Sequence, residues 1–178
     1  MMRYDAFQMA QHARSLSRAF HVRLIEDTGL ARHEAMAIPV DRLPPSKRGA
    51  LADWSGAVLC HPIEDETGYA VALHEIGHVL APLGSLVHER MRASSAVEEH
   101  TLKLMQEEAA WEWAEHYALD WTTAMEQVKQ FGLSSYHAGL LEAQAEAQAS
   151  RTPRPVDPQT AVRAAAIADC LARQRRVS

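Results

Sequence analysis

Two histidines and a glutamate stand inside an apolar stretch of the chain, in the order His74-Glu75-Ile76-Gly77-His78. Side chains four residues apart share one face of an α-helix, so the two imidazoles can bind the same Zn²⁺. The glutamate of such an H-E-x-x-H pattern serves as the general base toward zinc-activated water. A pair of solvated histidines is the alternative, but a half-buried pair in apolar surroundings needs partners.

A catalytic zinc needs a third ligand from the protein. The longer pattern H-E-x-x-H-x-x-G-x-x-H would supply it, but Ala81 and Gly84 stand where its glycine and last histidine belong. A later helical stretch, residues 105–121, is rich in carboxylates. The third ligand is therefore expected from a second helix.

Helical spacing alone does not choose between Glu107 and Glu108 as that ligand. It disfavours Glu115, because the same turn carries His116 and is typical of solvated surface. On the first helix, Gly77 has no side chain and would let a strand or a substrate backbone approach closely.

In the first half of the chain the sequence predicts two helices and a short strand. Apolar residues recur at three- and four-residue steps over residues 4–26, which predicts a helix ended by Thr28-Gly29, and again from Tyr69 to Leu80. Between them, residues 33–56 are expected to be mixed loop and short strand. The apolar run 56–63 predicts a strand, Pro62 favours an edge position for it, and residues 64–68 resemble a turn.

The second half of the chain is expected to be helical. One helix is predicted from near Ser95 through Glu126, followed by a break at 132–135 with Ser134 or Ser135 as the next N-cap. The fold class is thus α+β and mostly helical. We expect a first domain over residues 1–133, with its core at 50–121, and a helical extension over 134–178 that contains a proline-rich linker, 151–158.

Composition limits the remaining possibilities. The net charge of −5 gives no general attraction to nucleic acid, so direct nucleic-acid binding is not expected. No apolar run approaches the roughly 20 residues that a membrane span needs, and residues 1–20 lack the continuous apolar core that is typical of a secretion signal. Cys60 and Cys170 have no metal-binding spacing and are expected to be reduced thiols in a cytoplasmic protein. The oligomeric state is left open.

An H-E-x-G-H helix after a short strand, followed by a helix with the pattern E-x-x-A-x-x-[aromatic]-A, resembles the ImmA/IrrE family of zinc metallopeptidases. Residues 107–114 carry the second pattern, which ends in Trp113-Ala114. The resemblance implies a zincin-like core with a short sheet. It places the third zinc ligand at Glu107, with Glu108 as the alternative register, beside His74 and His78.

The function implied by this resemblance is a zinc-dependent metalloendopeptidase that cleaves a cytosolic protein, such as a transcriptional repressor, in a phage or mobile-element setting. Glu75 would be its catalytic base, and His61, at the end of the predicted strand, could stabilise a developing oxyanion. The alternative is a non-catalytic helical regulatory protein on the same scaffold. Its acidic, alanine-rich helices, 136–149 and 160–175, would bind a partner.

Overall fold

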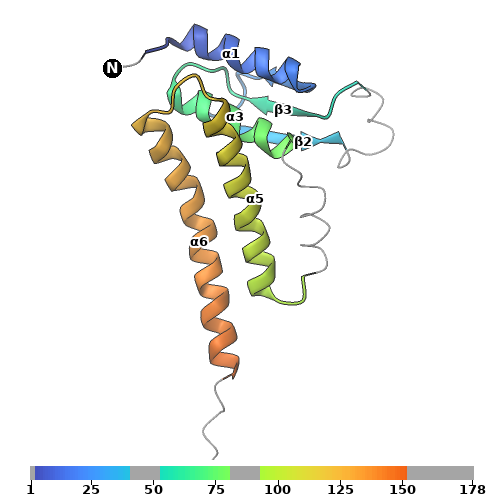
Figure 1. Cartoon of the computed structure of the whole chain (residues 1–178), viewed down its shortest axis with the longest axis vertical. Helices are drawn as coiled ribbons and strands as arrows, with labels where there is room; N and C mark the ends of the chain where they lie inside the picture. Colours follow the sequence, from blue (N-terminus) through green and yellow to red (C-terminus); the bar gives the residue numbers. More distant parts are fainter. Residues whose placement is uncertain (1–2, 41–52, 81–92, 152–178) are drawn as a thin grey trace, which may run out of the picture. The chain divides into compact units, whose positions relative to one another are not determined.

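The computed structural model describes residues 3–40, 53–80 and 93–151 (Figure 1). The chain divides into two compact units, Met1–Ala143 and Gln144–Ser178, and the site considered below lies in the first. The fold is α+β and mostly helical, as expected. In chain order its described elements are α1 (Ala6–Ala19), β1 (Val22–Glu26), β2 (Ala35–Pro39), β3 (Gly56–Cys60), α3 (Glu66–Leu80), α5 (Ala96–Tyr117) and α6 (Thr123–Arg151).

The three strands form one sheet in the order β1-β3-β2. β3 pairs parallel with β1 and antiparallel with β2, so it is the central strand and is buried along most of its length. The predicted edge position for this segment is therefore wrong. Pro62 lies beyond the last residue of β3, where its missing N–H removes no hydrogen bond from the sheet.

The predicted helix over residues 4–26 is wrong in its second half. α1 ends at Ala19, His21 adopts a positive φ of 55°, and residues 22–26 form β1. Pairing with β3 outweighs the helical spacing of the apolar residues here, because burial against a sheet overrides local pattern. Thr28-Gly29 consequently follows a strand and does not end a helix.

The segment expected as a turn, residues 64–68, is only partly one, because α3 begins within it at Glu66. Asp65 Oδ1 accepts a hydrogen bond from the Gly68 N–H at 2.8 Å, which satisfies one of the free donors of the first turn. The helix then continues from Glu66 to Leu80. The predicted helix from Tyr69 onward is thus confirmed, with an earlier beginning.

In the second half of the chain, the helices end and begin at other residues than predicted. The helix begins near Ser95 as predicted, with Ser95 as the N-cap of α5, but α5 ends at Tyr117 and α6 begins at Thr123. The predicted break at 132–135 is wrong, because α6 runs through it and the hydroxyls of Ser134 and Ser135 donate to carbonyls within the helix. A side chain at Gly132 would lie 3.4 Å from Trp111, so this glycine is a packing position.

Several expectations fall on residues that are not described. The linker from residue 152 onward, the helix 160–175 and Cys170 are among them. The domain boundary at residue 133 stays a prediction. Within the described ranges, no helix combines the length and the apolar character that a membrane crossing requires.

The core joins α1, the sheet, α3 and the end of α5, with Tyr69 fully buried at its centre. Burial raises the pKa of the Tyr69 phenol to about 12 and lowers the pKa of His12, so both groups are neutral near pH 7. The phenol O–H donates to His12 Nδ1 at 2.7 Å, and its oxygen accepts from the Leu119 N–H at 3.1 Å. Tyr69 therefore connects α1 and the segment after α5 to α3.

Replacing Tyr69 with phenylalanine is expected to cost about 1–3 kcal/mol, because it leaves the His12 nitrogen and the Leu119 N–H without their partner. In a chain of this size each kcal/mol lowers Tm by about 2–4 °C. Thermal unfolding followed by circular dichroism measures the change. Tyr117→Phe is the control, since the described structure shows ring contacts but no hydrogen bond for Tyr117. Equal stability of the two variants would contradict this role of Tyr69.

Candidate metal centre

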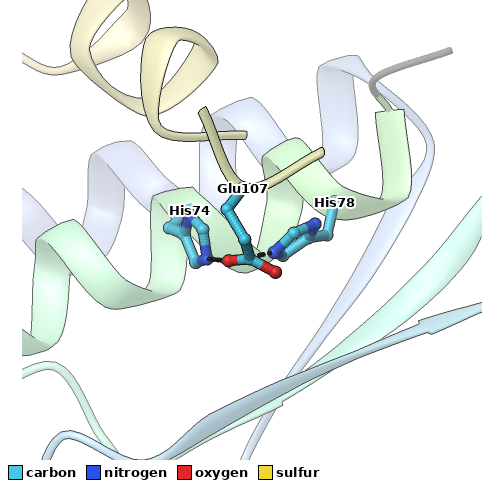
Figure 2. Close-up of side chains that lie close together, drawn as sticks. All are labelled: His74, His78 and Glu107. Atoms are coloured by element: carbon cyan, nitrogen blue, oxygen red, sulfur yellow. Dashed lines mark hydrogen bonds and ion pairs between the residues drawn. The ribbon is translucent and has the colours of Figure 1, made fainter. Parts of the chain in front are cut away.

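Three side chains from two helices converge beside the sheet. His74 and His78 extend from α3, and Glu107 extends from α5 between them (Figure 2). Glu107 Oε2 lies 3.3 Å from the Nε2 atom of each imidazole. All three potential ligand atoms lie within 4.8 Å of one another, and no other such group of histidine, cysteine or acidic side chains occurs in the described ranges.

The close approach of the two helices depends on Gly77. A Cβ atom at this position would lie 2.6 Å from the Ala110 carbonyl oxygen and 3.1 Å from Ala110 Cα, both in the backbone of α5. The expectation that Gly77 admits a strand or a substrate is therefore wrong, because the backbone that approaches is a helix. Glu107 lies one turn before Ala110 on α5. The close contact at Ala110 therefore brings the Glu107 side chain near the two histidines.

We expect Gly77→Ala to be destabilising despite a gain in helix propensity of about 1 kcal/mol. Overpacking costs about 1–3 kcal/mol, and a clash with backbone belongs to the upper end of that range because no side chain can move aside. As α5 shifts outward Glu107 recedes, so the affinity for Zn²⁺ should fall about tenfold or more. Urea unfolding and competition with a chromogenic chelator measure the two effects.

Gly68→Ala provides the matched control in the same helix. A Cβ atom there would meet only ordinary contacts, the nearest being Asp65 Oδ1 at 3.6 Å. Stability at or above that of the wild type is expected for this variant, with unchanged Zn²⁺ affinity. If Gly77→Ala behaved in the same way, the proposed dependence of the site on this close approach would be refuted.

The protonation states of Glu107 and His74 suit metal binding. Burial alone would raise the pKa of the Glu107 carboxyl, but hydrogen bonds from His74 and His78 outweigh it and lower that pKa to about 2. Burial lowers the pKa of His74. An ionised carboxylate and a neutral imidazole are the forms in which these side chains bind metal ions. Two nitrogen donors and one oxygen donor can therefore hold a divalent cation here.

The His74 ring is held in place by packing. Trp111 stacks on it with the ring centroids 4.0 Å apart and an angle of 23° between the planes. The Nδ1 atom of His74 is buried and has no hydrogen-bond partner in the described structure, whereas most metal-binding histidines use that atom to fix their orientation. Trp111 stands four residues after Glu107, so helical spacing places both side chains on one face of α5.

Glu75 lies between the three converging side chains and the sheet. Its Oε1 atom is 4.0 Å from His74 Nε2, and its Oε2 atom accepts a hydrogen bond from the Ala37 N–H of β2 at 2.7 Å. Burial raises the pKa of the Glu75 carboxyl, against the lowering effects of His78 and of the Ala37 hydrogen bond. The sequence does not predict the contact with Ala37, because it depends on how β2 is placed beside α3.

The other candidates from the sequence lie outside the group of three. Glu108 is half-buried on α5 but is not one of the converging residues. His61 follows β3, where its Nδ1 atom lies 3.1 Å from the Leu30 carbonyl oxygen, and its suggested role stays a prediction. Glu115 is on the surface as expected, paired with Lys129 at 2.8 Å. The described structure thus favours Glu107 over Glu108 as the third donor.

Comparison with known proteins finds no family, no curated protein and no solved structure that matches this chain. The resemblance to the ImmA/IrrE metallopeptidases therefore depends on the two sequence patterns alone.

Proposed function

We propose that this protein is a zinc-dependent endopeptidase. The observation that carries the proposal is the convergence of His74, His78 and Glu107 from two helices, with the Glu75 carboxylate directed toward the same point. Three protein ligands that leave one position open are typical of catalytic zinc sites. When bound, Zn²⁺ would lower the pKa of a water molecule and polarise a substrate carbonyl.

Three residues of the chain would bind the zinc ion, and a fourth would transfer the proton. His74 and His78 would supply nitrogen donors, and Glu107 would supply a negative charge that offsets part of the charge of the cation. Glu75 Oε1 faces the ligand atoms and can accept the proton of an attacking water. The same carboxyl can then donate that proton to the leaving amine of the cleaved peptide bond.

The substrate and the fold family are parts of the same proposal. Three features support a zincin-like core: the helix carries H-E-x-x-H, the next described helix supplies a third ligand, and a strand lies beside the proposed base. The resemblance to ImmA/IrrE peptidases suggests an intracellular protein as substrate, such as a transcriptional repressor. These parts depend on the sequence patterns and on the site geometry, since no matching relative supports them.

Cleavage of a peptide library tests the proposed reaction. Purified protein loaded with stoichiometric zinc is incubated with a mixture of unstructured peptides, and the products are sequenced by mass spectrometry. We expect internal cleavage that a chelator stops and that added zinc restores. If zinc-loaded protein cleaved no peptide in the library and no intact protein in a lysate, the proposed hydrolysis would be refuted in favour of a non-catalytic scaffold.

A further inference from the structure

The free edge of the sheet faces the proposed base. β2 is an outer strand, paired only with β3 in the described sheet. Hydrogen bonds from His61 N to Glu34 O and from Val40 N to Ser55 O flank β2, so its even-numbered residues direct their backbone groups toward β3. In an antiparallel pair the backbone groups of alternate residues point away from the partner strand. The amides of Ala35 and Ala37 therefore point to the free edge.

We infer that the Ala37 N–H is a positioning group for Glu75, an inference that rests on the proposed function for its catalytic meaning. At 2.7 Å from Glu75 Oε2, this amide makes a charge-assisted hydrogen bond to one carboxylate oxygen. The other oxygen, Oε1, then lies 4.0 Å from His74 Nε2, one of the three potential ligand atoms. A backbone group of the sheet thus fixes the rotamer of a side chain that originates on α3.

The hydrogen bond to Glu75 also determines which backbone groups of the β2 edge are free to bind a peptide. Because the Ala37 N–H already donates to Glu75, it is not available to a bound peptide. Removing it should therefore affect the reaction more than the binding of substrate. Proline, which has no backbone N–H, is already present at this edge, because Pro39 occupies the next edge-facing position of β2.

Ala37→Pro removes the N–H donor without removing a hydrogen bond between β2 and β3. Using the peptide that the wild type cleaves best, we expect kcat to fall about 100-fold, because a misplaced catalytic group costs about that factor. KM should stay within about twofold and zinc content should be unchanged, since the ligands and the substrate contacts are not altered.

Ala35→Pro is the matched control, because it removes an edge-facing amide two residues away that does not contact Glu75. Its kcat should stay within about threefold of the wild-type value, because Ala35 is the first residue of an edge strand, a position that tolerates proline. Equal losses of kcat in the two proline variants, or full activity of Ala37→Pro, would overturn the positioning role.

Amide hydrogen exchange tests the contact without any activity measurement. In isotope-labelled, zinc-loaded protein followed by NMR, the Ala37 amide should exchange at least about tenfold more slowly than the Ala35 amide, since only Ala37 has a charged acceptor. Glu75→Ala should remove that difference. Fast exchange of Ala37 in the wild type, or protection that persists in Glu75→Ala, would overturn the inference.

The kinetic measurements and the hydrogen-exchange measurements together distinguish a failure of this inference from a failure of the proposed function. Without hydrolysis by the wild type, the peptidase proposal fails and the catalytic meaning of the contact fails with it, while hydrogen exchange still decides whether the contact exists. With hydrolysis present, the two proline variants decide the positioning role directly.

Discussion

Replacing Glu75 with glutamine is expected to lower kcat by about 10²–10⁴-fold, the usual contribution of a general acid–base group, while the protein keeps its zinc. Glutamine has nearly the same size, and its amide oxygen can still accept the Ala37 N–H. It cannot take up the proton of an attacking water. Initial rates on the best-cleaved peptide and zinc analysis of the same samples measure both quantities.

Glu108→Gln is the control for this experiment, because it changes a carboxylate of α5 that lies outside the converging group. It should retain the wild-type rate. If Glu75→Gln cleaved the peptide as fast as the wild type, Glu75 would not be the base. The comparison with Ala37→Pro is also informative. The glutamine variant loses the group that accepts the proton but can keep the hydrogen bond to Ala37, whereas the proline variant keeps the Glu75 carboxyl and loses that hydrogen bond.

Removing the third donor is expected to have the second large effect. Substitution of groups that merely support metal ligands weakens metal binding about 10–100-fold, so Glu107→Ala should weaken Zn²⁺ binding at least about 100-fold. The variant loses the only carboxylate among the three converging residues and leaves the two imidazoles without their partner. Competition titration with a chromogenic chelator measures the affinity, and the Tm of the wild type, but not of the variant, should rise with added zinc.

Glu108→Ala is the matched control on the same helix, one residue away. It should bind zinc as tightly as the wild type. Zinc loss in Glu108→Ala with retention in Glu107→Ala would mean that the alternative register of α5 supplies the ligand. Retention in both would mean that no carboxylate of this helix turn binds the metal.

The relative placement of His74, Glu75 and His78 could be predicted from the sequence because it is local. Positions i and i+4 of a helix share a face whatever the rest of the fold does, so His74 and His78 needed only the helix to be correct. For the third donor, helical spacing disfavours Glu115 but does not choose between Glu107 and Glu108, and the resemblance favours Glu107. The choice depends on the crossing of α3 and α5, which the backbone contact between Gly77 and Ala110 determines.

Features that depend on pairing between distant segments could not be predicted. β1 has apolar residues at helical spacing, and only its alignment with β3 makes it a strand. The glycine and serines at 132–135 are typical of a helix boundary, yet packing of Gly132 against Trp111 accommodates them within α6. The hydrogen bond between Ala37 and Glu75 likewise requires the placement of β2 next to α3.

Anomalous diffraction from a crystal of the zinc-loaded protein, recorded on both sides of the zinc absorption edge, is the most direct test of the central claim. The account predicts a zinc peak at coordination distance from His74 Nε2, His78 Nε2 and a carboxylate oxygen of Glu107. A peak that Glu107 does not contact, or no zinc between the two histidines, would contradict it.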